Sequence, residues 1–159
     1  MFAIEPATRQ DLSYLHRAMA ALLAHVRDTS QDAYLLRLTD RYIEDSVDWL
    51  ARLMASDESI VLVAKRGGEP VGYAIGSLTR PFIERSAIET IGLIEHCWVE
   101  PACRRQALAT KLVEALERWF SERSVEFVDV QYLLGNSEAE ATWVRLGYRP
   151  YRVIARKQL

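Results

Sequence analysis

Cysteine is scarce in this sequence, and the placement of its two residues excludes several kinds of protein. Cys97 and Cys103 lie six positions apart, with no Cys-x-x-Cys pair and no histidine at ligand spacing. Disulfide scaffolds and zinc sites need closely patterned cysteines, so the sequence indicates neither, and we expect no metal. Cys97 is expected to be a small core residue on a strand, and Cys103 an exposed thiol in a loop.

A strong charge excess and a long apolar run are also missing. The formal net charge is −2, which gives no general basic surface for nucleic acid and leaves only a local basic patch at Arg104 and Arg105. The longest apolar run, Ala18 to Ala24, is far too short to span a membrane, and the first residues show no signal-peptide pattern. We therefore expect a soluble, cytoplasmic protein that binds neither nucleic acid nor membrane.

The length and composition suit one folded domain. A chain of 159 residues can bury roughly 70% of its unfolded surface in a single domain. Half of the residues are apolar and 26% are charged, as in ordinary globular proteins. No repeat, low-complexity tract or linker divides the chain, so we expect one domain over residues 1–159.

Residues 94–121 contain the most informative pattern, a strand followed by a helix. A β-type run stops at Pro101, and apolar residues then recur at helical spacing at Leu108, Leu112, Leu116 and Trp119. The backbone N–H groups at the start of a helix are unpaired and carry the positive end of the helix dipole. Two arginines and the small residues Ala107 and Ala109 lie at this start, which predicts a cradle for phosphate groups.

The remaining patterns predict an α/β fold of order β-α-α-β-β-β-α-β-α-β with a mixed, largely antiparallel sheet. Strands are expected at residues 2–5, 60–64, 71–75, 89–99, 125–131 and 151–155, with a Gly-Gly hairpin turn at 65–70. Helical stripes are expected at 12–26, 43–54, 108–119 and 137–146, the first after a capping box of Thr8 and Asp11. Residues 27–40 and 80–86 are expected to be irregular connections.

The strand at residues 89–99 carries an unusual carboxylate. Strict alternation places Ile91, Leu93, Glu95, Cys97 and Val99 on one side, and Gly92, Ile94, His96 and Trp98 on the other. Glu95 thus interrupts an apolar row, and a carboxylate there is costly unless it is paired or functional. By this alternation His96 points away from Glu95, although a bulge would change the assignment.

Two motifs resemble those of the GCN5-related N-acetyltransferases, the GNAT family. The order V-x-P-x-x-R-x-x-A-x-A-x-x-L is similar to the family's acyl-CoA motif (Q/R)-x-x-G-x-(G/A), which maps to Arg104, Ala107 and Ala109. The segment from Asn136 to Tyr148 resembles the second signature, N-x-x-A-x-x-F-Y-x-x-L-G-F. Two motifs in the correct order are harder to obtain by chance than one, and with the hairpin the resemblance covers nearly the whole chain.

The resemblance implies a single-domain GNAT fold and transfer of an acetyl group from acetyl-CoA to a primary amine of a small molecule or peptide. In the family, the fourth and fifth strands diverge and the pantetheine arm lies between them. The resemblance implies that Val99 N–H polarises the thioester carbonyl and that Arg104 to Thr110 wrap the pyrophosphate. The implied acyl-CoA contacts are Cys97, Trp98, Val99, Arg104, Arg105, Gln106, Ala107, Leu108, Ala109, Thr110, Asn136 and Trp143.

The same resemblance suggests Glu95 as the base that takes a proton from the amine, with a structural or acceptor-binding carboxylate as the alternative. It also implies that residues 27–40 border the acceptor cleft, where aspartates would attract a cationic amine; an ordinary solvated loop is the alternative. The protein is expected to be a monomer or a homodimer. The acceptor itself is left open by the sequence.

Two departures from the family pattern keep other functions open. Ala107 replaces the family's central glycine, and a Cβ at a left-handed position costs on the order of 1 kcal/mol. Trp143 replaces the tyrosine that usually protonates the leaving thiolate, and indole N–H only donates hydrogen bonds. An acyl-CoA-binding sensor module without efficient catalysis, or a structural protein of the same fold, therefore remains as an alternative to the enzyme.

Overall fold

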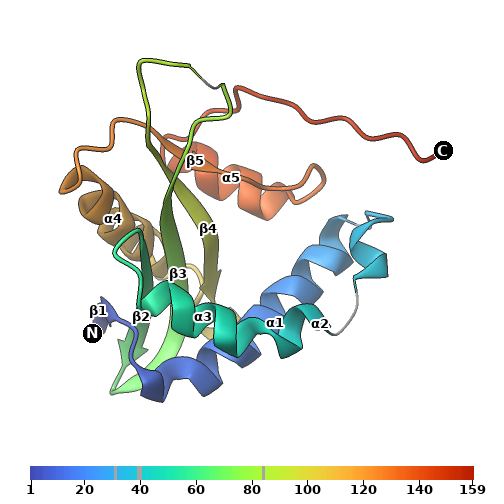
Figure 1. Ribbon diagram of the computed structural model, residues 1–159. Helices are drawn as coiled ribbons and strands as arrows, with labels where there is room; N and C mark the ends of the chain where they lie inside the picture. Colours follow the sequence, from blue (N-terminus) through green and yellow to red (C-terminus); the bar gives the residue numbers. More distant parts are fainter. Residues whose placement is uncertain (31, 39–40, 84) are drawn as a thin grey trace.

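A five-stranded sheet in the order β1-β2-β3-β4-β5 organises the chain, and the computed structural model describes residues 1–30, 32–38, 41–83 and 85–159 (Figure 1). The strands are β1 (Phe2–Pro6), β2 (Ser59–Arg66), β3 (Glu69–Thr79), β4 (Ile91–Val99) and β5 (Val128–Val130). Strands β1 to β4 pair antiparallel, and β5 pairs parallel to β4. The predicted mixed, mostly antiparallel sheet is confirmed.

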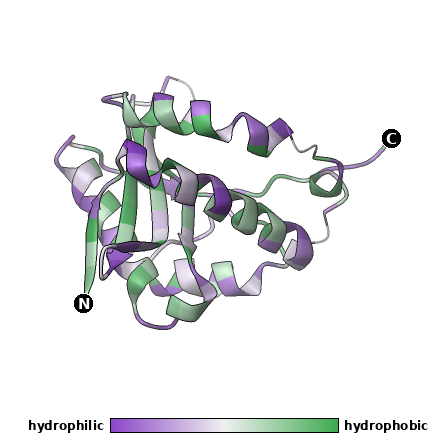
Figure 2. Ribbon diagram, turned by 90° about the horizontal axis from the view of Figure 1, so that it is seen from below, coloured by the Kyte–Doolittle hydropathy of each residue, from purple (hydrophilic) through white to green (hydrophobic). Residues whose placement is uncertain are grey.

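Helices lie on both faces of this sheet. The helical segments are η1 (Arg9–Asp11), α1 (Leu12–Ser30), η2 (Leu35–Arg37), α2 (Arg41–Glu44), α3 (Ser46–Met54), η3 (Pro101–Cys103), α4 (Leu108–Ser121) and α5 (Ser137–Arg145). Figure 2 shows that their apolar residues are interrupted by polar ones, as expected of helices with one buried side. None of the described helices has the length and apolarity needed to cross a lipid bilayer.

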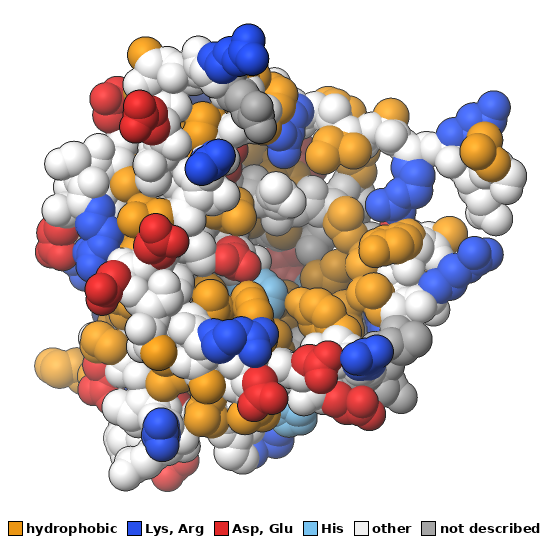
Figure 3. Space-filling model, in the orientation of Figure 1, with side chains coloured by type: hydrophobic (Ala, Val, Ile, Leu, Met, Phe, Trp, Pro, Cys, Tyr) orange, Lys and Arg blue, Asp and Glu red, His pale blue; other side chains and the backbone are white. Residues whose placement is uncertain are grey.

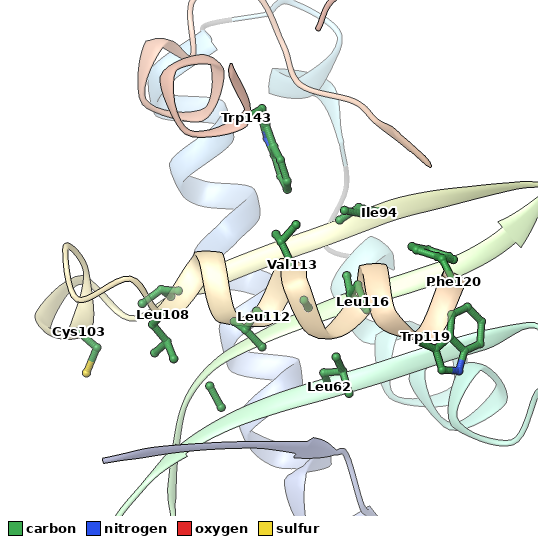
Figure 4. Packing of buried hydrophobic residues seen from close by; sticks show 13 residues of the cluster. Leu62, Ile94, Cys103, Leu108, Leu112, Val113, Leu116, Trp119, Phe120 and Trp143 are labelled. Carbon is green, nitrogen blue, oxygen red and sulfur yellow. The ribbon is translucent and has the colours of Figure 1, made fainter. Parts of the chain in front are cut away.

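Two hydrophobic clusters occupy the two faces. On one face, the α4 side chains Leu108, Leu112, Leu116 and Trp119 are buried in the cluster, as the helical spacing predicted, and Phe120 joins them (Figure 4). On the other face, α1 and α3 contribute Leu15, Met19 and Leu50 to a second cluster. Burying a side chain of this size contributes roughly 1.5–3 kcal/mol, so each face anchors its helices firmly.

The helical region before β2 differs from the prediction in two ways. Helix α1 begins after the predicted capping box, in which Thr8 N–H donates to Asp11 at 2.8 Å, but it continues to Ser30 instead of ending near residue 26. The predicted second helix is two helices that meet at Asp45, and Val47 is exposed while Leu50 is buried. Part of the predicted connection 27–40 is therefore helical.

Several predicted positions lie outside the described residues. These are Gln31, Thr39 and Asp40 in the connection 27–40, and Glu84 in the loop 80–86.

Strand β4 contains a bulge that corrects the predicted alternation. Ile75 of β3 pairs with His96, but the next residue, Gly76, pairs with Ile94, so Glu95 is an extra residue on β4. As a result, the side chains of Cys97 and Val99 belong to the α4 cluster and not to the side of Glu95. The prediction of one continuous row on that side is therefore wrong beyond the bulge.

The C-terminal part of the chain forms less sheet than predicted. Only residues 128–130 of the predicted strand 125–131 pair as β5. The predicted strand 151–155 does not form, and Tyr151, Val153 and Ile154 are exposed. The apolar, β-branched composition of a strand is present, but strand structure also needs a hydrogen-bonding neighbour, and the described part of this chain provides none there.

One of the two cysteines lies in the environment that the sequence predicted, and the other does not. Cys97 packs against the α4 cluster on β4, as predicted. Cys103 is not an exposed loop thiol: it lies in η3, and its side chain is buried in the same cluster. The turn after Pro101 directs it inward. No group of three or more His, Cys, Asp or Glu residues in the described ranges is arranged to hold a metal ion.

Candidate active site

The two edges of β4 are paired over different lengths. Along one edge, β3 pairs with β4 from Ile91 to Val99. Along the other edge, β5 pairs only with Gly92, Leu93 and Ile94. Between Glu95 and Val99, this second edge therefore has no neighbouring strand among the described residues. An extended ligand finds unpaired main-chain groups here, as an added strand would.

The main-chain groups of Val99 point towards this open edge. Glu100 N–H donates to Val71 O on the β3 side at 3.0 Å. Because successive residues of a strand direct their main-chain groups to opposite edges, Val99 N–H and C=O face the other way. The Val99 carbonyl accepts a hydrogen bond from Arg104 Nε at 3.1 Å, which leaves the N–H for a ligand. This orientation supports the predicted role of Val99 N–H, which itself stays a prediction.

A tight bend connects the open edge to α4. Arg105 and Ala107 both adopt left-handed backbone conformations, with φ of 59° and 57°. Ala107 is the N-cap of α4 and offers no side-chain cap, so the first amides of the helix have no side-chain partner at the cap. Turns of this kind bring successive N–H groups to one side, and the helix dipole adds positive potential there. The bend therefore fits a diphosphate.

Side chains around the bend divide into exposed and structural groups. Arg105, Gln106 and Ala107 are exposed, whereas the Leu108 side chain is buried, so Leu108 has only its backbone to offer a ligand. Arg104 is half-buried, with its guanidinium 4.8 Å from the ring centroid of Trp98. This cation–π contact and the bond to Val99 fix Arg104 beside the end of β4.

A cleft of about 280 Å³ opens where β4 and β5 diverge, between α1 and α5. Figure 3 shows this face of the molecule hollowed near its centre, with hydrophobic side chains around the hollow. The lining is mostly apolar and comes from α1, η2 and the residue after it, α2, β4, β5 and the chain after it, and α5. Its residues are Met19, Leu22, Leu23, Val26, Leu35, Leu38, Tyr42, Ile94, Glu95, His96, Cys97, Val130, Gln131, Tyr132, Leu133, Asn136, Ala139 and Trp143.

Glu95 is the one charged side chain among these described lining residues. Its carboxylate accepts a short hydrogen bond from the Ser77 hydroxyl on β3. Tyr42 of α2 lies near Glu95. Burial raises the pKa of the Tyr42 phenol, and the negative charge of Glu95 raises it further. The bulge therefore presents a single carboxylate, held by a neighbouring hydroxyl, in an otherwise apolar cleft.

The bulge also brings His96 to the same side as Glu95, which the alternation did not predict. His96 Nδ1 lies 3.2 Å from the Tyr73 hydroxyl, and its ring lies 5.5 Å from that of Trp49. Burial lowers the pKa of His96 to about 4. The His96 imidazole is thus neutral near pH 7 and is no cationic partner for Glu95. Glu95 remains the source of negative charge in the cleft.

The predicted contacts on α5 have structural partners of their own. Asn136 is the N-cap of α5, and its side chain accepts a hydrogen bond from Ala139 N–H at 3.1 Å. Trp143 is buried in the α4 cluster (Figure 4). It makes an edge-to-face contact with Tyr148, and the two ring centroids lie 5.4 Å apart. Both residues also line the cleft, so the second motif forms one of its walls.

The structure brings most of the predicted site residues together. Glu95, Cys97, Asn136 and Trp143 line the cleft, and the residues 104–110 lie at the bend that follows the open edge. The Trp98 side chain belongs to the opposite cluster, and its main-chain groups point to β3 because those of Val99 face the open edge. Sequence reasoning missed Ser77, because nothing in its local pattern reveals a cross-strand partner displaced by a bulge.

The chain belongs to the GNAT family of acetyltransferases: the family model, described as "Acetyltransferase (GNAT) family", matches residues 18–148. This places the protein among the acetyl-CoA-dependent N-acetyltransferases and confirms the family suggested by the two motifs. The same match covers both the bend before α4 and helix α5.

Among individual relatives, aminoglycoside 6′-N-acetyltransferases recur. The type 1 enzyme of Klebsiella aerogenes is 26% identical over 101 residues, which are 64% of this chain and 66% of that protein. Aminoglycoside 6′-N-acetyltransferase AAC(6′)-IG from Acinetobacter haemolyticus has a similar fold, with a TM-score of 0.76, 18% identity and coverage of 99% and 97% of the two chains. AAC(6′)-Iy, solved in complex with CoA, gives a TM-score of 0.77, 16% identity and coverage of 99% and 95%.

Proposed function

We propose that this N-acetyltransferase acetylates a primary amine of an aminoglycoside-like polycation and that Glu95 accepts the proton released by that amine. The observation that carries the proposal is the single carboxylate in a mostly apolar cleft at the open edge of β4. A lone, half-buried anion favours the entry of a cationic group, and an ammonium is the form in which such acceptors reach the protein. The recurrent aminoglycoside acetyltransferases among the relatives support this class of acceptor.

Acetyl-CoA supplies the acetyl group as a thioester. We propose that the amides after Ala107 and the side chains of Arg105 and Gln106 hold its diphosphate, because the bend exposes these groups at the positive end of α4. Val99 N–H, directed to the open edge, donates a hydrogen bond to the thioester carbonyl oxygen. Cys97 offers a further main-chain group two residues earlier, and Asn136 and Trp143 bound the same space.

In this proposal Glu95 removes a proton from the acceptor amine. An alkylammonium has a pKa near 10.4, so only a small fraction is a free nucleophile at neutral pH. A carboxylate within the cleft takes the proton directly or through one water molecule as the amine attacks. The Ser77 hydroxyl, by donating to Glu95, holds the carboxylate in one orientation and acts as a positioning group.

The leaving thiolate needs no dedicated acid in this mechanism. Trp143 has only an indole N–H and is buried in the α4 cluster, so it does not deliver a proton. A thiol with a pKa near 8.5 leaves readily as the thiolate, and water protonates it afterwards. Trp143 therefore shapes the wall of the cleft.

A release assay for free thiol tests the proposal. Acetyl-CoA is incubated with the protein and with matched pairs of aminoglycosides that carry or lack a free 6′-amine; a polyamine and a peptide with a free N-terminus complete the panel. We expect thiol release to depend on the free amine and to be fastest with the 6′-amino compounds. Release with the polyamine or peptide alone would overturn the acceptor class and leave the family assignment untouched.

A second candidate, an acyl-CoA-binding sensor, is favoured by the left-handed Ala107, which lacks the family's glycine at this position. It predicts the same cofactor binding without acceptor-dependent turnover. Acetyl-CoA at about one hundred times its dissociation constant should stabilise either protein by about 2.7 kcal/mol. Stabilisation with no thiol release across the panel would select the sensor over the enzyme.

A further inference from the structure

His96 is a polar side chain in the cleft that the proposed reaction does not use. It follows Glu95 directly in the sequence, and both residues line the cleft. Successive residues of a regular strand point to opposite faces of the sheet, so the bulge is what allows these two to reach one space. In Figure 3, histidine surface is visible in the hollow next to acidic surface. The cleft therefore presents a carboxylate and an imidazole side by side.

The hydrogen bond to Tyr73 decides which nitrogen of the His96 ring carries the proton. Tyr73 is fully buried, and its hydroxyl lies 3.2 Å from His96 Nδ1, the one hydrogen-bond partner that the described residues give it. A buried hydroxyl whose proton has no acceptor is costly, so the Tyr73 hydroxyl donates to Nδ1. The ring is neutral near pH 7 and has a single N–H group. That N–H group is therefore at Nε2.

The Nε2–H group has no partner among the described residues, and it is within reach of a ligand. In the same part of the chain, Tyr14 Oη is the one fully enclosed side-chain nitrogen or oxygen atom that lacks a hydrogen bond. Nε2 also lacks one, so it is not fully enclosed. A reachable N–H group at the wall of a mostly apolar cleft favours a ligand that brings a hydrogen-bond acceptor to it.

The two side chains together match one arrangement of ligand atoms. The Glu95 carboxylate only accepts hydrogen bonds and attracts an ammonium group, whereas the His96 Nε2–H group only donates and suits an uncharged oxygen. Because the two residues are adjacent in the chain, the nitrogen and the oxygen must be close neighbours in the ligand. An amine and an oxygen that are separated by two carbon atoms satisfy this requirement. An aminomethyl group next to the ring oxygen of a pyranose contains such a unit.

We propose that His96 is a specificity-determining residue whose Nε2–H group donates a hydrogen bond to an ether or hydroxyl oxygen two carbon atoms from the reacting amine. The inference rests on the proposed function and narrows its acceptor class to amines with this neighbouring oxygen. His96 transfers no proton in the reaction, because the amine proton goes to Glu95. Tyr73 acts as a positioning residue, since its hydroxyl holds the imidazole in the donating tautomer.

A pair of small amines that differ in one ring atom tests the proposal. Tetrahydropyran-2-ylmethylamine has a ring oxygen two carbon atoms from its nitrogen, and cyclohexylmethylamine has a CH₂ group in the same place. The ratio of kcat/KM for the ether amine to kcat/KM for the hydrocarbon amine is the oxygen preference. Comparing this ratio between protein variants removes the intrinsic difference in reactivity between the two amines. We expect His96→Phe to lower the oxygen preference about tenfold, as the loss of one hydrogen bond predicts.

Two further variants separate the hydrogen bond from other effects. His96→Gln keeps an N–H donor of similar reach and should retain most of the oxygen preference. Tyr42→Phe removes a hydroxyl that lines the same cleft and is a rival donor, and it should leave the oxygen preference unchanged. Circular dichroism and stabilisation by CoA establish that each variant is folded. An oxygen preference that is equal in His96→Phe and the natural protein, or that is lost in Tyr42→Phe instead, would overturn the proposal.

Nitrogen NMR of protein labelled at its three histidines reads the tautomer without any turnover. The His96 signals are those that His96→Phe removes. We expect Nδ1 to be the unprotonated nitrogen at pH 7, and Tyr73→Phe to weaken this bias. A proton on Nδ1 in the natural protein would overturn the proposal.

The proposed function and this inference fail in different ways. If neither amine were acetylated, the proposed function would be contradicted, and calorimetric affinities for the two amines would then measure the oxygen preference in place of kcat/KM. Acetylation of both amines with an oxygen preference that does not depend on His96 would contradict this inference alone.

Discussion

The two halves of β4 show how one strand serves both stability and function. From Gly92 to Ile94 it is paired on both edges, and Gly92 packs directly under Phe120. From Glu95 to Val99 it is paired only with β3, and its other edge opens on the cleft. A single extra residue, Glu95, separates the two. We call the part paired on both edges the closed half and residues 95–99 the open half. The bulge ends the closed half and at the same time directs the Glu95 carboxylate into the cleft.

Replacement of the carboxylate in the open half should have the largest effect. We expect Glu95→Gln to lower kcat at neutral pH by about 10²–10⁴-fold, the usual contribution of a general base, with little change in CoA binding. Ser77→Ala, which removes the hydrogen bond but keeps the carboxylate, should cost less. Steady-state kinetics and calorimetry with CoA measure the two effects separately.

Glu89→Gln is the matched control, because Glu89 is an exposed carboxylate shortly before the same strand. It should leave kcat unchanged. Equal kcat for Glu95→Gln and the natural protein across the pH range would exclude Glu95 as the base, and the open half would then serve binding alone.

The buried imidazole of the open half should make stability depend on pH. Burial lowers the pKa of His96 to about 4 in the folded protein, from about 6.5 when unfolded. Between these values the unfolded chain binds a proton that the folded chain does not, so stability falls as the pH drops from 6.5 towards 4. The loss is on the order of 3 kcal/mol. Urea unfolding at a series of pH values measures it.

In this series His96→Gln should flatten the pH dependence, whereas His25→Gln, which leaves His96 in place, should not. An equally steep loss in the His96 variant would assign the acid sensitivity to other groups. The closed half contains no histidine, so its contribution to the slope is expected to be small.

A change in the closed half should affect stability and leave ligand binding alone. A Cβ added at Gly92 would lie 2.8 Å from two ring carbons of Phe120, whose side chain is fully buried. We expect Gly92→Ala to lower the free energy of unfolding by about 1–3 kcal/mol, with unchanged affinity for CoA. Phe120→Leu in the same variant should recover part of this loss, because the two sites are in contact.

If Gly92→Ala weakened CoA binding as strongly as it lowered the free energy of unfolding, the closed half of β4 would contribute to ligand binding as well as to stability. Chemical unfolding and calorimetry on the same preparation decide this point.

The smallest expected effect concerns the bend that follows the open half. Ala107 adopts φ of 57°, a conformation that favours glycine. Ala107→Gly should raise the free energy of unfolding by up to about 1 kcal/mol and improve CoA affinity by a few-fold or less. Ala109→Gly, inside α4, is the control and should destabilise the helix instead. A loss of CoA affinity in Ala107→Gly would contradict the strain at this position.

Much of the fold was accessible from local patterns. The apolar spacing of α4, the hairpin between β2 and β3, and the capping box before α1 each rest on residues close in sequence, and each is present in the structure. The two motifs predicted the family because they define a bend and a helix N-cap, which are also local features. The sequence left the sign of φ at Ala107 open, and the structure gives it as 57°.

The errors arose where distant segments decide the outcome. The bulge at Glu95 depends on the pairing of β4 with β3, and no residue near position 95 reveals it. The partners of Glu95 and His96, Ser77 and Tyr73, come from the neighbouring strand. The missing strand at 151–155 has the correct composition but lacks a neighbour, which composition cannot supply.

The placement of the two thiols has a practical consequence for enzymology. Cys103 is enclosed by the core and out of reach of reagents, and burial raises the pKa of the half-buried Cys97 thiol to about 12, so Cys97 is not a thiolate near neutral pH. A colorimetric disulfide reagent added during turnover should therefore record released CoA with almost no protein background. The same reagent in denaturant should react with two thiols per chain. The ratio of thiols that react without and with denaturant then measures the unfolded fraction of a preparation.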